Sequence, residues 1–198
     1  MRGTCAASRR AGGYSLIECL LVLALIASAS AIGTPMAASA IAEERARQAA
    51  GFVASRFRLA RERAAATGAA EGVVFDSVAS TWTFRVCADG NGNGVRRGEL
   101  ATVDACVEGP HAMAALFGTV QIARDVSIPD PGGGPASPDP VRFGASDVAT
   151  FTPHGTATAG TVFLLSAAGT QYAVRVAGIT GRTRVLRYDS GSSQWEAQ

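Results

Sequence analysis

A single carboxylate, that of Glu18, stands at the start of an apolar run in which residues 19–42 carry no charge. A carboxylate that enters the middle of a membrane costs about 2.5–3.5 kcal/mol, so Glu18 needs a positive partner or access to the lipid headgroups. If the chain is cut after Gly13, the new α-amino group of Tyr14 lies within about one helical turn of Glu18. Two roles therefore stay open for Glu18: a counter-ion for that amine, on the same or a neighbouring subunit, or a side chain that reaches the headgroups.

Arg182 and Arg184, in the segment Gly181-Arg182-Thr183-Arg184, form a second group that could do chemistry. On a β-strand, residues two apart point to the same face, and Arg175 or Arg187 could lie near them. Guanidinium groups gathered in this way bind phosphate. The sequence leaves two interpretations open, a phosphate-binding patch and strand arginines that are only solvated.

Asp89, Asn91 and Asn93 place side-chain oxygens at alternate positions, each followed by glycine, with Glu99 further on. Oxygen ligands at this spacing are what a tight wrap around Ca²⁺ requires. The match to an EF-hand is incomplete, because the bidentate Glu of such a loop would stand where Leu100 stands. A structural turn is therefore the favoured interpretation, and these residues are weak metal candidates.

The chain has four cysteines, of which Cys5 precedes the apolar run, Cys19 lies within it, and Cys87 and Cys106 lie beyond it. Two cysteines in an exported domain indicate a disulfide. Closing a loop of that size would stabilise the domain by roughly 3 kcal/mol in the chain-entropy model. Two free buried thiols are the alternative.

No set of residues predicts catalysis or a bound cofactor. His111 and His154 have no Cys or carboxylate at metal-ligand spacing. The run Gly132-Gly133-Gly134 lacks the Lys-Ser/Thr that completes a phosphate-binding loop, and no Gly-x-Ser-x-Gly elbow occurs. We therefore expect no enzyme activity and no cofactor.

The element that must position Glu18 is a membrane-spanning helix over residues 14–36. Such a helix is about 35 Å long, enough for a hydrocarbon core of roughly 30 Å. Arg2, Arg9 and Arg10 precede it, so the positive-inside rule places the N-terminus in the cytoplasm and the rest of the chain across the membrane. Without these three, the 18 basic side chains fall to 15 against 16 acidic ones, and bulk charge does not indicate a nucleic-acid binder.

An ordinary secretory signal is the alternative for this segment. Arg9-Arg10, the apolar run and Ala29-Ser30-Ala31 also fit its three-part pattern. Glu18 at the start of the run argues against that interpretation, because the apolar region of a secretory signal has no place for a charge.

Beyond Pro35, which with Gly33 is expected to kink or locally melt the helix, residues 37–67 keep a helical pattern of apolar positions. This amphipathic half should pack on the following domain and end at Gly68.

Residues 68–198 read as a β-rich head, since the apolar period changes to about two. The predicted strands are 73–75, 81–86, 120–128, 141–143, 149–152, 161–166, 172–176 and 182–188. Residues 129–140, rich in Pro and Gly, are expected to form a mobile surface loop.

The segment Gly13-Tyr14-Ser15-Leu16-Ile17-Glu18, followed by the apolar run, resembles the class III prepilin signal of type IV pilins and type II secretion pseudopilins. The resemblance implies cleavage after Gly13, N-methylation of Tyr14 by a prepilin peptidase, and use of Glu18 in assembly. Tyr14 departs from the more usual Phe. Similar proteins also have a helix-breaking Pro near position 35.

The head is similar to that of minor pseudopilins of the GspH/FimT family, the type II secretion system protein H-like proteins. The likeness rests on Asp89–Gly94 with Gly98-Glu99, Phe151–Gly155, Gly160–Leu165 and Gly181–Arg184, and leaves residues 107–140 unmatched. Members often carry a further Asp before Gly-Glu, where this chain has Arg96-Arg97.

The resemblance implies an α+β, pilin-like fold with a leader over residues 1–13 and a long N-terminal helix packed on a β-sheet head. We expect a minor pilin or pseudopilin that acts at or near the tip of a pseudopilus or pilus in assembly and protein secretion. It would cross the inner membrane once, with its head in the periplasm. Expected partners are other pilins, the prepilin peptidase, the inner-membrane assembly platform, membrane lipid and secreted cargo.

Two other functions stay open. FimT-like members bind DNA in natural transformation through a Gly-Arg-x-Arg motif, and in this chain Arg182 and Arg184 occupy it. The other alternative is a freely secreted β protein, which a cut after Ala31 would indicate.

Overall fold

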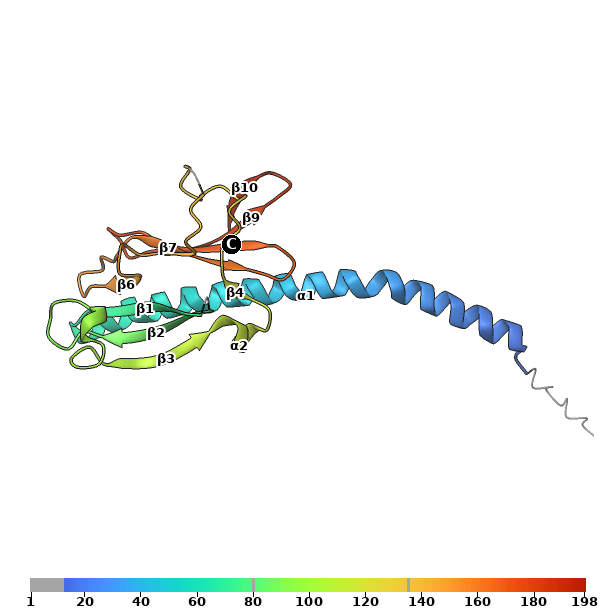
Figure 1. Cartoon of the computed structure of the whole chain (residues 1–198), viewed down its shortest axis with the longest axis horizontal. Helices are drawn as coiled ribbons and strands as arrows, with labels where there is room; N and C mark the ends of the chain where they lie inside the picture. Colours follow the sequence, from blue (N-terminus) through green and yellow to red (C-terminus); the bar gives the residue numbers. More distant parts are fainter. Residues whose placement is uncertain (1–12, 80, 135) are drawn as a thin grey trace, which may run out of the picture. The chain divides into compact units, whose positions relative to one another are not determined.

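The computed structural model describes residues 13–79, 81–134 and 136–198, and for residues 32–35 the backbone only. One long helix, α1 (Leu16–Thr67), is followed by antiparallel sheets, which is an α+β layout consistent with a pilin-like fold (Figure 1). Of the expected leader, residues 1–12 lie outside the described residues. The chain divides into two compact units, residues 1–38 and 39–198.

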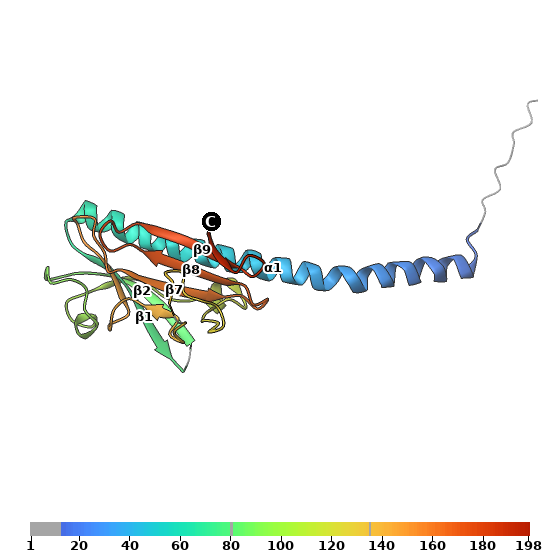
Figure 2. The ribbon, with the colours of Figure 1, turned by 90° about the horizontal axis from the view of Figure 1, so that it is seen from above.

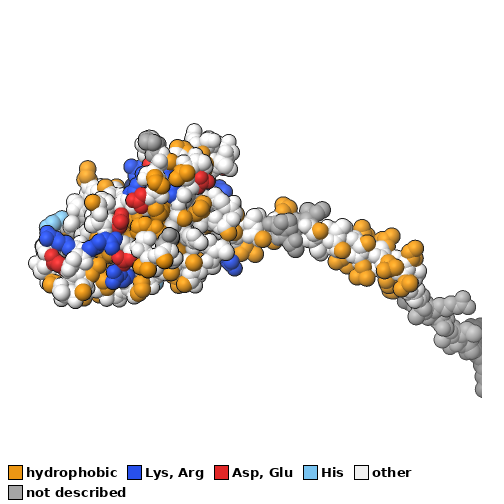
Figure 3. All heavy atoms as spheres, in the orientation of Figure 1, with side chains coloured by type: hydrophobic (Ala, Val, Ile, Leu, Met, Phe, Trp, Pro, Cys, Tyr) orange, Lys and Arg blue, Asp and Glu red, His pale blue; other side chains and the backbone are white. Residues whose placement is uncertain are grey.

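The first unit consists of the N-terminal part of α1. Its apolar side chains are exposed, for example Leu16, Leu20 and Leu23, and they dominate the visible surface of this segment (Figure 3). Among the described residues, α1 is the one helix that is long and apolar enough to cross a membrane. This criterion uses length and composition only, and a signal sequence also meets it. The helix assignment is continuous through position 35, and the expected kink at Pro35 stays a prediction.

The second unit begins with the remainder of α1, which carries a fully buried stripe on one face. The members recur at spacings of one, three and four, as expected for one side of a helix. Most are alanine, which lets the helix backbone approach the sheets closely. The stripe consists of Ala46, Ala49, Ala50, Val53, Ala54, Phe57, Ala60 and Ala64.

The helix ends as the sequence predicts. Gly68 follows Thr67 with φ of +73°, and its N–H donates to Ala64 O at 3.1 Å. The left-handed conformation favours glycine, so this residue both satisfies a terminal carbonyl and turns the chain into the first strand.

Two antiparallel sheets make up the rest of the unit. The first has the order β3-β2-β1-β6, and the second has the order β10-β9-β8-β7-β4 with β5 also paired to β7. The elements are β1 (Glu71–Val78), β2 (Thr81–Ala88), a 3-10 turn η1 (Arg97–Glu99), β3 (Cys106–Ala112), α2 (Met113–Phe117), β4 (Gln121–Ile122), β5 (Val141–Arg142), β6 (Val148–Phe151), β7 (Gly160–Leu165), β8 (Gln171–Val176), β9 (Thr183–Asp189) and β10 (Gln194–Ala197).

An aromatic cluster joins α1 to both sheets. The Phe57 ring centroid lies 6.2 Å from that of Phe75 on β1, 5.9 Å from that of Phe151 on β6, and 5.5 Å from that of Phe143, which follows β5. The second part of α1 accordingly runs along the sheets in both ribbon views (Figure 2). One helix therefore closes a core that neither sheet completes alone.

Most predicted strands are confirmed to within a residue or two, but the strand predicted over 120–128 is wrong. Only Gln121–Ile122 form a strand there. Asp125 then interrupts the extended chain, since its side chain accepts hydrogen bonds from Ser127 N at 2.9 Å and from Ser127 Oγ at 2.7 Å. Such an Asx turn competes with strand pairing.

Candidate functional site

The residues around the expected cleavage point lie at the exposed start of α1. Gly13 and Tyr14 precede the helix, and the Tyr14 side chain is 84% exposed. Glu18 is exposed in the first helical turn. The arrangement leaves the Gly13–Tyr14 peptide bond accessible and places a carboxylate one turn further on.

Ser15 begins the helix as its N-terminal cap. Its carbonyl accepts hydrogen bonds from Glu18 N at 3.0 Å and Cys19 N at 3.1 Å, and its Oγ accepts one from Ile17 N at 3.3 Å. Ser15 and Glu18 have the spacing of a capping box, and a carboxylate in the first turn is stabilised by the helix dipole. Glu18 thus also suits the helix locally, a role that the sequence interpretation did not include.

The Asp89 loop is held together by its own hydrogen bonds. Asp89 Oδ1 accepts from Asn91 N at 3.1 Å and Gly92 N at 2.8 Å, while Oδ2 accepts from Gly94 N at 2.7 Å. Burial raises the pKa of Asp89, but these bonds to the charged form outweigh it, and the net pKa is lowered.

The other candidate ligands of this loop contact one another. The side-chain amides of Asn91 and Asn93 donate to Glu99, at 2.6 Å and 3.2 Å. Within the described ranges, no group of three or more His, Cys, Asp or Glu side chains is placed to hold a metal ion. The structural-turn interpretation accounts for all of these contacts.

A second carboxylate, Asp104, holds the loop from the other side and was not predicted from the sequence. It is fully buried, and it accepts hydrogen bonds from Gly90 N at 3.2 Å and Arg96 N at 2.8 Å. Arg97, close to this loop in the sequence, pairs with Asp76 on β1 at 2.7 Å.

Replacing Asp89 by Asn is expected to destabilise the chain by roughly 2 kcal/mol near neutral pH, because hydrogen bonds to a charged acceptor are lost. Since the folded pKa of Asp89 is lowered, its contribution is present above the ordinary carboxyl pKa and is lost as the pH falls through the folded value. In urea unfolding, the difference between Asp89→Asn and the parent chain should therefore shrink as the pH falls below the ordinary carboxyl pKa of 3.8. Glu62→Gln, at an exposed position on α1, is the control. A penalty independent of pH would contradict this account.

Cys87 and Cys106 form a disulfide, with an S–S distance of 2.10 Å. The two residues are also register partners on β2 and β3, so the bond closes the base of the loop that contains Asp89 and Asp104. Cys19, on α1, is a free exposed cysteine.

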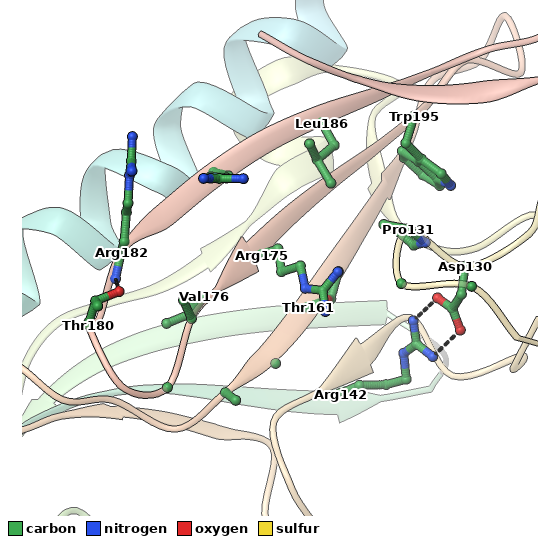
Figure 4. A pocket seen from close by; sticks show the side chains of 17 residues that line it. Asp130, Pro131, Arg142, Thr161, Arg175, Val176, Thr180, Arg182, Leu186 and Trp195 are labelled. Carbon is green, nitrogen blue, oxygen red and sulfur yellow. Dashed lines mark hydrogen bonds and ion pairs between the residues drawn. The ribbon is translucent and has the colours of Figure 1, made fainter. Parts of the chain in front are cut away.

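Arg182 and Arg184 border a hollow of about 1130 Å³ on the second sheet (Figure 4). Its floor comes from β7, β8 and β9, and residues 130–133 form a wall. The lining residues are Asp130, Pro131, Gly132, Gly133, Arg142, Ala159, Gly160, Thr161, Arg175, Val176, Ala177, Gly178, Thr180, Arg182, Arg184, Leu186 and Trp195.

The strand register decides which arginines share the hollow. Arg175 on β8 lies directly opposite Arg184 on β9, and both are exposed. Arg182 is also exposed and stands one residue before β9, where its carbonyl accepts a hydrogen bond from Ala177 N at 3.0 Å. Arg187 falls on the other face and pairs with Glu43 of α1 at 2.7 Å. In the described part of the chain, Arg175, Arg182 and Arg184 form no ion pair with an acidic side chain.

The wall of the hollow carries an acid that is already neutralised. Asp130 accepts hydrogen bonds from Arg142 and, at 3.1 Å, from Arg124 Nη1. The hydrogen bond from Arg142 lowers the pKa of Asp130, and burial opposes it only in part. Both guanidinium groups lie over the Phe163 ring, 4.1 Å and 4.9 Å from its centroid. Residues 129–134 are thus anchored at Asp130, a contact that the composition of the segment did not predict.

The two histidines lie in different surroundings. His111 Nε2 lies 2.9 Å from Glu108 Oε1, and its ring packs edge-on against Phe52 of α1. His154 is exposed in a turn. Both observations fit packing and surface roles.

Comparison of the chain with protein-family models, curated proteins and solved structures gives no match. The fold itself defines the class, an α+β protein in which a long, apolar N-terminal helix packs on a β-sheet head.

Proposed function

We propose that this chain is a minor pilin or pseudopilin of the GspH/FimT type, a structural subunit of a type II secretion pseudopilus or type IV pilus. The observation that carries the proposal is Glu18 in the first turn of an exposed apolar helix, directly after an accessible Gly13–Tyr14 bond. That helix continues into a segment whose alanine-rich face packs on a β-sheet head.

In this function the apolar part of α1 lies in the inner membrane with the head in the periplasm. A prepilin peptidase removes the leader and methylates Tyr14. The apolar helices of neighbouring subunits then pack together in a filament, and Glu18 of one subunit pairs with the α-amino group of Tyr14 of another. A charge pair in an apolar surrounding is strongly favoured over two separate charges, which gives the filament a fixed register.

The N-terminal mass of the mature full chain, produced together with a prepilin peptidase, tests the processing step. We expect a chain that begins at Tyr14 and carries one added methyl group, and Gly13→Val should stay uncut. A chain that begins after Ala31, or an uncut parent chain, would remove the proposal.

Glu18→Ala tests the assembly step separately. The variant should be cut as the parent chain is, but it should no longer co-assemble with the other subunits, because the Tyr14 amine has lost its partner. Ser28→Ala, on the same apolar segment, is the matched control. Normal co-assembly of Glu18→Ala would restrict Glu18 to capping the helix.

A second function, DNA capture, is supported by the hollow that Arg182 and Arg184 border. Arginines without acidic partners at a concave surface attract phosphate groups. The full chain in an uncharged detergent should bind DNA with an affinity that falls as salt rises, and replacing both arginines by Gln should weaken it. Replacing Arg45 and Arg58 together by Gln, at exposed positions outside the hollow, controls for the loss of two charges. Unchanged affinity, or no salt-dependent binding at the start, would end this proposal.

A further inference from the structure

We propose that the hollow on the second sheet takes a single nucleic-acid strand, with phosphates on Arg175, Arg182 and Arg184 and a base against Trp195. The inference rests on the second proposed function. It specifies that the DNA is single-stranded and adds two contact residues, Arg175 and Trp195. It follows from the register of the sheet, from the neutralised wall, and from the apolar end of the hollow.

The first step concerns Arg175 and Arg184. They are direct cross-strand partners, and like charges at such positions destabilise a sheet. Within the described chain no acid relieves the repulsion, whereas Arg142 and Arg187 nearby each have one. A negative group that bridges Arg175 and Arg184 would turn this repulsion into binding.

The second step concerns the direction in which a ligand lies. Figure 4 shows Arg182 at one end of the hollow, Arg175 in the middle, and Pro131 and Trp195 at the other end. Asp130, at that far end, accepts hydrogen bonds from both Arg124 and Arg142, while the guanidinium of Arg175 reaches Gly132 of the wall. Phosphates are therefore drawn to Arg175, Arg182 and Arg184, and the end with Pro131 and Trp195 adds apolar surface.

Trp195 is fixed as part of that apolar end. Its Nε1 donates to Pro129 O at 2.8 Å, and its ring packs edge-on against Tyr188 with the centroids 5.5 Å apart. The side chain is only half-buried and lines the hollow beside Leu186 and Pro131. A held aromatic ring next to basic side chains is the combination on which bases of single strands stack.

These features separate a single strand from a duplex. The bases of a duplex are paired and stacked inside, so a duplex offers the hollow only its backbone and leaves Trp195 without a partner. A single strand exposes base faces next to its phosphates. The arginines serve both forms, but Trp195 distinguishes them.

The emission of Trp195 reports the contact directly. The chain has two tryptophans, so Trp82→Phe leaves Trp195 as the one reporter. With this full-length variant in an uncharged detergent, oligothymidine should quench the emission and bind more tightly than the same strand annealed to its complement. The duplex should leave the emission unchanged.

Substitutions assign the two kinds of contact. Trp195→Leu should weaken oligothymidine binding about ten-fold, whereas Trp195→Phe, which keeps a ring, should retain most of it. Arg175→Gln should lower the slope of log affinity against log salt by about 0.7, the value for one phosphate contact with a single strand. Arg58→Gln should leave the slope unchanged.

The outcomes distinguish this inference from the function on which it rests. Equal affinity for strand and duplex, with no change in Trp195 emission, overturns the inference and leaves DNA capture standing. The absence of salt-dependent binding to either form removes both. If Trp195→Leu also weakens folding, the emission measurement in Trp82→Phe decides.

Discussion

Truncating Phe57 to Ala is expected to lower the free energy of unfolding by about 3–5 kcal/mol, which is a large part of the stability of a domain of this size. Phe57 is fully buried, and its ring contacts Phe75 and Phe151 of the first sheet and Phe143 beside the second. Removing it leaves a cavity at the point where α1 and both sheets meet.

The cost should be high because the walls of this cavity cannot collapse easily. Phe75 and Phe143 are stacked with their ring planes 1° apart, and Phe75 also packs against Phe84 on β2. Each neighbour is thus held by a further contact, and the loss of one ring leaves the others without a dispersion partner. Urea unfolding of the full chain in an uncharged detergent, followed by circular dichroism, measures the change.

Phe52→Ala is the matched control. Phe52 lies on the same helix five residues earlier, but it is only half-buried, so its truncation should cost clearly less. Equal losses of stability for the two variants would show that the packing of α1 in general stabilises the chain, and that the contact of Phe57 with both sheets contributes nothing extra.

The sequence predicts the parts of this fold that local periodicity determines. The buried stripe of α1 follows from apolar residues at threes and fours, and the end of the helix follows from Gly68. β1 and β2 follow from short runs rich in β-branched and aromatic residues, Val73–Phe75 and Thr81–Val86. In these segments the local structure is determined by residues that are close in sequence, so the sequence pattern is sufficient to predict it.

Two strands escaped prediction because their sequences lack that pattern. β3 contains Gly109 and Pro110, which are unfavourable in strand interiors, but β3 is an edge strand, where a missing backbone donor is tolerated. β10 has four residues and is held by pairing with β9. Both depend on a neighbour that sequence spacing does not reveal.

The hollow shows the same limit for the candidate site. The sequence left Arg175 and Arg187 open as neighbours of Arg184, and the pairing of β8 with β9 selects Arg175. Trp195 and Asp130 come from segments that the motif does not include. Trp195 is held by a contact with Pro129, 66 residues away in the chain, and Asp130 by its ion pair with Arg142. The motif indicates the chemistry of the site, but the shape of the hollow and its apolar end could not be predicted without the fold.

Replacing Cys87 and Cys106 by Ala is expected to lower the free energy of unfolding by about 3 kcal/mol. The bond joins residues 19 apart, and in the chain-entropy model a loop of that size gives roughly this gain by restricting the unfolded chain. Cys87 is also fully buried against Val74, Val95 and Val148, so its truncation removes some packing as well. The loss is expected to appear in urea unfolding of the full chain.

The covalent and packing contributions can be separated with a reductant. Reduction keeps both sulfur atoms in place, so the parent chain should lose most of the 3 kcal/mol in dithiothreitol, while the double variant should be unaffected by it. Cys19→Ala, which removes the free exposed cysteine, is the control and should change neither value. If the double variant is destabilised but reduction of the parent chain is not destabilising, packing of Cys87 and not the bond stabilises the head. If the bond does act, the loop held by Asp89 and Asp104 should also lose its protection from hydrogen exchange on reduction, because the disulfide closes the base of that loop.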